Sequence, residues 1–279
     1  MAVTVIGSVR SCGVTTLALT LAATWPSQRR VLLAEFDPAG GTLAAACGWP
    51  SEPSLVSLAA AARRGGDPAM VWQHCQALST GSAVLAGPVS AEHAQSALAM
   101  LGELTRRLSE LDADVLVDGG RLDPVSPVSA VLDGADLALL AVRPRLTDLH
   151  ALATWLDSHS IEAEQELIVI GDGPYSDAEI AEALGIPVLA RVPWDPDAAQ
   201  AIVSVPADSR ELRLAPLVRA ARSLADRLAS EFDPSVPTSV AHAAAETSMT
   251  LRRKFTRALR PVATTAPSMN GVSDQGSSG

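Results

Sequence analysis

The chain has 279 residues, of which 48% are hydrophobic and only 19% are charged, so it can bury a sizeable core as one large domain or two small ones. The high hydrophobic and low charged fractions exclude a chain that is disordered throughout. Aromatic residues make up only 3% of the sequence, which favours a core of small aliphatic side chains. The formal net charge of −10 argues against a surface that coats nucleic acid, because phosphate neutralisation needs clustered lysine and arginine, and we expect no nucleic-acid partner.

Seven short apolar runs recur along the chain with helical stretches between them. Their apolarity is continuous rather than alternating, which indicates that both faces of each strand are covered, as in a parallel sheet between layers of helices. The predicted fold class is therefore α/β, a doubly wound and mostly parallel sheet with helices on both faces. The predicted strands are residues 3–6, 31–34, 84–86, 115–117, 137–142, 167–170 and 188–190.

Helices are predicted between and after these strands, at residues 15–23, 94–111, 176–184 and 214–228, with Ser176 as an N-cap. The last of them has apolar residues at the 3,4 spacing of one helix face and is expected to close the fold. We therefore expect one α/β domain over residues 1–232. It would be followed by a flexible linker (233–248), a basic amphipathic helix (249–261) and a disordered tail (262–279).

The cysteines and the N-terminus favour a cytoplasmic location. Cys12, Cys47 and Cys75 have neither the spacing of a zinc site nor the even count of a disulfide scaffold, and they are compatible with a reducing compartment. The N-terminus has no pattern of an export signal. No segment reaches the ~20 clean apolar residues that a membrane span requires.

The first predicted strand is followed by a glycine-containing loop and then by a helix, a context in which backbone amides can cradle an anion. The segment Gly7-Ser8-Val9-Arg10-Ser11-Cys12-Gly13-Val14-Thr15-Thr16 resembles the deviant Walker A loop of the MinD/ParA ATPases, Lys-Gly-Gly-x-Gly-Lys-Thr-Thr. Gly13 and Thr15-Thr16 match the end of that motif. The resemblance implies binding of ATP or ADP with magnesium, and loop contacts from Arg10, Ser11, Cys12, Gly13, Val14, Thr15 and Thr16.

The two lysines of the motif are missing from this loop. Val9 and Val14 stand where they belong, and valine supplies neither a charge nor a hydrogen bond to the β and γ phosphates. Weak nucleotide binding and weak or absent ATP hydrolysis are therefore expected. Arg10 lies one position from the first missing lysine; it serves a phosphate from a shifted loop or is simply a solvated arginine.

Two strand-end motifs also resemble MinD/ParA proteins. The strand at 31–34 runs into Glu35-Phe36-Asp37-Pro38, similar to the family's Asp-x-Asp-Pro, and the strand before Asp118 resembles Walker B. The resemblance implies magnesium binding by Thr15, Asp37 and Asp118, with Asp37 as a catalytic residue. Alternatively, Asp37 and Asp118 are ordinary strand-end carboxylates, and Thr15 only caps a helix.

A later segment, residues 186–195, is similar to the part of the family fold near the adenine pocket. The resemblance implies nucleotide contacts from Pro193 and Asp195.

Between Thr247 and Val262 the acidic chain carries five basic residues and no acidic ones. On a helical wheel the apolar and basic side chains of this segment separate onto different faces, and Pro261 ends the helix. Such a helix can lie on the inner membrane surface, more firmly in a dimer, or dock on a protein partner. The expected membrane contacts are Leu251, Arg252, Arg253, Lys254, Phe255, Arg257, Leu259 and Arg260.

Together these features predict a homodimeric MinD/ParA-like protein that positions or recruits division, secretion or pilus machinery at the inner face of the membrane, rather than a fast enzyme. An unidentified protein partner is expected. One alternative is an active ATPase in which Arg10 replaces the lysine. A second is a dinucleotide-binding oxidoreductase whose Glu35 holds a ribose, although the loop lacks Gly-x-Gly-x-x-Gly.

Overall fold

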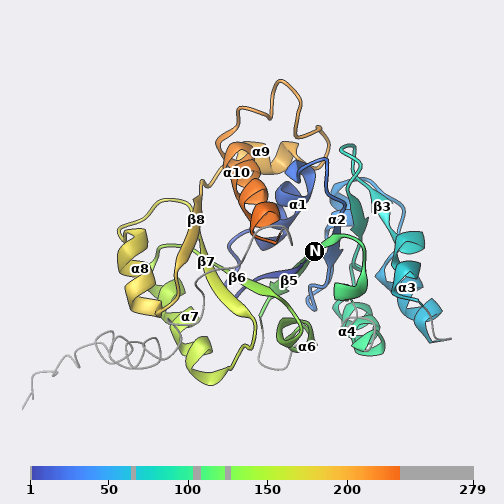
Figure 1. The fold of residues 1–279 in the computed structure, drawn as a ribbon, viewed down its shortest axis with the longest axis horizontal. Coiled ribbons are helices and arrows are strands. Elements are labelled where there is room, and N and C mark those ends of the chain that lie inside the picture. Colours follow the sequence, from blue (N-terminus) through green and yellow to red (C-terminus); the bar gives the residue numbers. More distant parts are fainter. Residues whose placement is uncertain (1, 64–66, 103–107, 123–126, 233–279) are drawn as a thin grey trace, which may run out of the picture.

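The computed structural model describes residues 2–63, 67–102, 108–122 and 127–232. These residues form an eight-stranded sheet in the order β3-β4-β2-β5-β1-β6-β7-β8 (Figure 1). Every neighbouring pair is parallel except β3 and β4. The strands are β1 (Val3–Ser8), β2 (Val31–Glu35), β3 (Gln76–Ala77), β4 (Ala83–Leu85), β5 (Asp114–Arg121), β6 (Leu137–Val142), β7 (Glu164–Ile170) and β8 (Val188–Val192).

Helices cover both faces of the sheet, as the continuous apolar strands require. One face is packed against α1 (Val14–Thr24), α2 (Leu43–Ala46), α9 (Pro196–Ala201) and α10 (Pro216–Glu231). The other face is packed against α3 (Leu55–Ala62), α4 (Ala91–Met100), α6 (Ser129–Asp133), α7 (Leu146–Ser158) and α8 (Asp177–Leu184), with the 3₁₀ turns η1 (Pro68–His74) and η2 (Leu108–Glu110). The predicted α/β sheet with helices on both faces is therefore confirmed.

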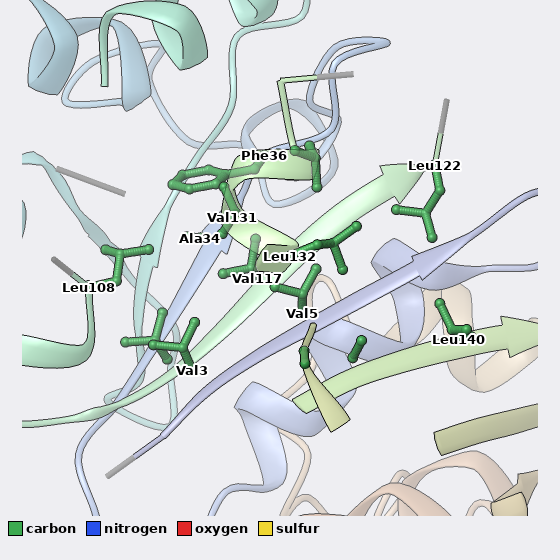
Figure 2. Packing of buried hydrophobic residues seen from close by; sticks show 14 of the residues in the cluster. Val3, Val5, Ala34, Phe36, Leu108, Val117, Leu122, Val131, Leu132 and Leu140 are labelled. Atoms are coloured by element: carbon green, nitrogen blue, oxygen red, sulfur yellow. The ribbon is translucent and has the colours of Figure 1, made fainter. Parts of the chain in front are cut away.

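Alternate residues of each central strand belong to different cores. In β1, Val3 and Val5 join the cluster with α3, α4 and α7, whereas Ile6 joins the cluster with α1 and α10. Figure 2 shows Val5 beside Val117 of β5 and Leu132 of α6. Since all of these side chains are nearly or completely buried, the middle of the sheet is a rigid base for the loops at its ends.

All seven predicted strands are present. They differ from the prediction chiefly in length, because the polar residues Ser8, Glu35 and Asp118 continue their strands. The predicted helix at 94–111 is interrupted, since α4 is capped at Leu101, whose φ and ψ of −91° and 3° leave the helix. Ser176 is the predicted N-cap, and it forms a capping box with Glu179.

The chain after the last helix was predicted to contain a linker (233–248), a basic helix (249–261) and a tail (262–279). These segments lie outside the described residues. Within the described ranges, no helix combines the length and apolarity needed to cross a membrane.

Candidate functional site

The carboxyl ends of β2, β5, β1 and β6 meet at one edge of the sheet, because these four neighbours run parallel. Asp118 of β5 lies in register with Ile6 of β1 on one side and with Glu35 of β2 on the other. Ligands of open parallel sheets bind at this edge. The loop between β1 and α1 crosses it and brings the predicted loop residues next to the predicted carboxylates.

The loop ends at Gly13, which has a left-handed φ of 94° and is the N-cap of α1. The carbonyl of Gly13 accepts the first helical hydrogen bond, from the Leu17 amide at 3.0 Å. No side chain caps this helix end, and its first turn has no acidic residue. The first-turn amides and the positive end of the helix dipole therefore favour an anion at this position.

Val14 begins the helix, and its side chain is only 5% exposed. It packs in the same apolar cluster as Cys12, Leu17 and Leu21. A buried aliphatic group thus occupies the position at which the matching loops carry a cation. Phosphate binding here would depend on backbone amides and on cations from elsewhere.

Cys12 is buried in the loop, and burial raises the pKa of its thiol to about 11. The nearby Ser8 side chain and the Arg143 charge oppose this rise, but burial dominates. The thiol is therefore neutral at physiological pH, and Cys12 contributes packing rather than a reactive thiolate.

Asp118 is completely buried at the end of β5. Its Oδ1 accepts a hydrogen bond from the Gly120 amide at 3.0 Å, whereas Oδ2 has no hydrogen-bond partner among the described residues. Burial raises the Asp118 pKa to about 7; the Thr15 hydroxyl lowers it, and the neighbouring Glu35 raises it further. The effect of the Thr15 hydroxyl on this pKa places Thr15 beside the Asp118 carboxyl group.

These oxygens fit a hydrated magnesium ion, which retains several waters and needs only one or two carboxylates from the protein. The described residues contain no group of three histidine, cysteine, aspartate or glutamate side chains able to hold a metal. A site of this type would therefore use Thr15 and Asp118, with water and ligand oxygens completing the shell. The same pattern excludes a closed structural metal centre in this part of the chain.

Asp37 is half-buried just beyond the end of β2. Its Oδ1 accepts a hydrogen bond from the Ala39 amide at 2.8 Å. Desolvation raises the Asp37 pKa, and the Ala39 hydrogen bond and the Arg121 charge lower it. Asp37 and Asp118 thus flank Gly120 from neighbouring strands, as expected from the parallel topology.

Glu35 is only 1% exposed, and backbone amides from two loops surround it. Its Oε1 accepts hydrogen bonds from Thr42 at 2.6 Å and Leu43 at 3.0 Å, and its Oε2 accepts one from Gly87 at 2.8 Å. Glu35 therefore ties the loop before α2 to the loop after β4. Its enclosed carboxylate is not available to a ribose, which argues against the oxidoreductase alternative.

An apolar cavity of about 220 Å³ lies on the other side of the loop, between α1, the ends of β7 and β8, and α9. The predicted contacts Pro193 and Asp195 line it together with Cys12, Gly13 and Thr16. The Asp195 carboxylate itself caps α9, accepting from the Ala198 amide at 3.1 Å. The loop and the 186–195 segment are thus brought together, and the cavity has the apolar lining that suits a flat ring.

Sequence reasoning missed several residues at this edge. Trp194 lines the apolar cavity although its side chain is 55% exposed, and the guanidinium of Arg143 stacks on its ring at 4.0 Å. Arg121 donates a hydrogen bond to the Ser11 hydroxyl at 2.9 Å. The available signal was position, since Arg143 directly follows the predicted strand 137–142 and Arg121 lies four residues beyond the predicted strand 115–117.

Solved structures share this fold. No model of a known protein family matches the chain, and no curated protein matches it in sequence. A ParA family ATPase from Chlorobium tepidum matches with a TM-score of 0.67 and 18% identity, over 81% of this chain and 98% of the other. MinD from Pyrococcus horikoshii, solved with Mg-ADP, matches with a TM-score of 0.63 and 18% identity, over 81% of this chain and 96% of the other. The MinC:MinD complex from Aquifex aeolicus matches with a TM-score of 0.63 and 17% identity, over 86% of this chain and 99% of the other.

These similarities identify the fold as the P-loop NTPase type of the MinD and ParA proteins, which confirms the resemblance predicted from the loop and strand-end motifs. At 17–18% identity these similarities establish the fold alone. The contacts of the candidate site therefore carry the functional argument.

Proposed function

We propose that the chain is a MinD/ParA-like positioning or recruitment protein whose nucleotide site has lost most of its capacity for hydrolysis. It would bind ATP or ADP weakly at the loop after β1, with magnesium at Thr15 and Asp118. It would act as a homodimer at the inner face of the membrane, as a switch or scaffold for division, secretion or pilus machinery. Its output would be the placement of a protein partner rather than rapid turnover.

The burial of Val14 is the observation on which this proposal depends. The surrounding loop is intact, with a left-handed Gly13 and an uncapped helix N-terminus, so the position of the missing cation is well defined. At that position the side chain is 5% exposed and packed with Leu17. Transfer of a phosphoryl group depends on neutralising its charge, and an aliphatic side chain contributes nothing to this step.

Other features support the retention of a nucleotide. Gly13 and Thr16 are shared between the loop and the apolar cavity, so a ring in the cavity and phosphates on the loop belong to one continuous site. The unpartnered Asp118 Oδ2 offers an oxygen for the water shell of magnesium. The similar MinD structure from Pyrococcus horikoshii contains Mg-ADP.

The full-length chain tests this proposal in two measurements. Calorimetric titration with Mg-ATP and Mg-ADP should give weak but saturable binding, and a phosphate-release assay should show little or no turnover above background. Rapid magnesium-dependent phosphate release by the wild-type chain would refute the loss of hydrolysis. The complete absence of nucleotide binding would refute the retained site.

Membrane attachment is proposed for residues 249–261, which lie outside the described residues. Removal of residues 247–279 should release the protein from anionic vesicles, because the basic and apolar faces of the helix would be lost together. Replacing Arg253, Arg257 and Arg260 by glutamine should weaken binding to anionic vesicles while leaving the apolar face unchanged. Vesicle binding that persists after the truncation would exclude this anchor, and docking of the helix on a protein partner would then replace it.

A second candidate, supported by the position of Arg10, is an active ATPase. Arg10 is exposed on the loop, close to where the family's first lysine stands, and it makes no side-chain hydrogen bond with the described residues. In this case magnesium-dependent phosphate release would be substantial and would be abolished by Arg10→Ala and by Asp37→Ala. Equal turnover in the wild type and in both variants would exclude this candidate.

A further inference from the structure

A second cavity, of about 460 Å³, lies beside the loop and is lined by four arginines from three separate segments. Arg10 comes from the loop itself and Arg121 from the end of β5. Arg143 and Arg145 come from the connection between β6 and α7. Among the described residues lining this cavity, Asp148 is the only acidic one.

This concentration of arginines contrasts with the overall charge of the protein. The chain has 31 acidic and 21 basic residues, so a random surface region would carry a net negative charge. Four guanidinium groups around one cavity repel one another, and a single carboxylate offsets only part of that repulsion. A bound anion with several charges would remove the repulsion, which is the physical reason to expect one here.

Two of the arginines are already held in place. Arg121 donates to the Ser11 hydroxyl at 2.9 Å, and the guanidinium of Arg143 lies 4.0 Å from the centre of the Trp194 ring. The Nε of Arg143 is buried and has no hydrogen-bond partner among the described residues. Buried donors are normally paired, so an unpaired one beside a cationic cavity indicates a missing acceptor.

The two cavities meet at the loop. Ser11 lines the arginine cavity and Cys12 lines the apolar one, and the stacked pair Arg143 and Trp194 contributes one residue to each. Guanidinium groups bind phosphate oxygens in pairs of parallel hydrogen bonds, which a single ammonium group cannot do. The arrangement is therefore suited to a condensed phosphate that extends from the loop amides.

We infer that Arg10, Arg121, Arg143 and Arg145 form a binding site for a di- or triphosphate group, which replaces the cation that Val14 removes from the loop. This inference rests on the proposed function only in one respect, namely whether the bound phosphate group belongs to a nucleotide. A nucleotide would place its ring in the apolar cavity, whereas an inorganic polyphosphate would use the arginine cavity and the loop alone. In both cases the arginines bind charge, and no step of catalysis is assigned to them.

The test uses the full-length chain and inorganic tripolyphosphate. Arg10 and Arg145 are exposed and make no side-chain hydrogen bonds with the described residues, so the pair Arg10→Gln/Arg145→Gln should fold normally, as thermal unfolding can verify. Titration calorimetry should show tripolyphosphate binding that weakens as salt is raised, and at least about tenfold weaker binding in this pair. The control pair Arg213→Gln/Arg219→Gln removes the same charge from exposed positions outside the cavity and should bind as the wild type does.

Parallel titrations with ATP and adenosine distinguish the source. If ATP binds more tightly than tripolyphosphate and both weaken in the Arg10/Arg145 pair, the arginine site serves a nucleotide. If tripolyphosphate binding depends on the arginines but ATP binds no more tightly and adenosine does not bind, the arginine site stands and the proposed nucleotide site fails. If the wild type binds no tripolyphosphate, or both variant pairs weaken it equally, the inference is overturned.

Discussion

The backbone of Gly120 lies against the carboxylate of Asp37, so closely that a β-carbon on Gly120 would overlap the Asp37 carboxyl carbon and both of its oxygens. Gly120 also has a left-handed φ of +55°. The two residues stand at the ends of the neighbouring strands β5 and β2. Their contact therefore fixes the spacing of the two loops that bring acidic side chains to the site.

Replacing Gly120 with alanine should both strain the backbone and displace Asp37. We expect a loss of about 2–4 kcal/mol in the free energy of unfolding, measured by urea denaturation. Gly48→Ala is the matched control, because Gly48 also has a positive φ, of 67°, but has open space around its would-be β-carbon. The control should lose only about 1 kcal/mol. Equal losses of unfolding free energy in Gly120→Ala and Gly48→Ala would show that the contact with Asp37 does not contribute to stability.

The buried carboxyl group of Asp118 should make stability depend on pH. Its pKa in the folded state is about 7, above the ordinary value of 3.8, so the folded protein binds a proton that the unfolded chain has already released between these two values. The contribution of the protonated Asp118 to the free energy of unfolding is therefore fully present below pH 3.8 and is lost as the pH rises through about 7. Glu166 should act in the same direction, because burial also raises its pKa to about 7.

The variant Asp118→Asn isolates this contribution. We expect the free energy of unfolding of the wild type to fall more steeply between pH 5 and pH 8 than that of the variant, because asparagine does not titrate. The exposed Asp112→Asn should retain the steep wild-type slope. A slope that is identical in the wild type and in Asp118→Asn would contradict the raised pKa.

Glu35→Gln should loosen the two loops that Glu35 joins. Glutamine can still accept from the Thr42 and Leu43 amides, but its NH₂ group would face the Gly87 amide and leave that donor unpaired. We expect a cost of about 1–3 kcal/mol and faster hydrogen exchange at Gly87. The exposed Glu92→Gln serves as a control that should leave both quantities unchanged. Unchanged exchange at Gly87 in Glu35→Gln would contradict the structural role of this carboxylate.

Much of the fold could be predicted from the sequence because continuous apolar runs, such as Leu137–Val142, leave few alternatives to a buried parallel strand. The position of the loop was predictable for a similar reason, since a strand, a glycine and a helix follow one another directly. The two-residue strand β3 was not predicted, because Gln76 and Ala77 carry no apolar pattern and pair only through the fold.

The candidate site was predictable only in part. Asp37 and Asp118 follow recognisable strands, so their convergence follows from parallel topology. Glu35 joins two loops through hydrogen bonds from the amides of residues 42, 43 and 87. No local sequence pattern specifies how these amides are arranged. The arginine cavity likewise requires three segments to meet. The loop resemblance indicated Arg10, but the sequence shows Arg121 and Arg143 only as isolated charges.

Restoring a cation at the loop should strengthen nucleotide binding. In Val14→Lys the long side chain can leave the apolar cluster and place its ammonium group over the loop, at some cost in stability because apolar burial is lost. We expect Mg-ATP to bind at least about tenfold more tightly than to the wild type, as measured by calorimetry. Val14→Met, which has a long side chain but no charge, should show no gain.

The gain in Mg-ATP affinity in Val14→Lys also tests the role of the cavity arginines Arg10 and Arg145. If they already neutralise the phosphates, Val14→Lys should improve affinity less in the wild-type background than in Arg10→Gln/Arg145→Gln, because the new charge would then replace a lost one. Gains of equal size in the two backgrounds would mean that position 14 and the arginine cavity contribute independently to Mg-ATP binding. The absence of any gain in either background would mean that the buried valine is not what limits nucleotide binding.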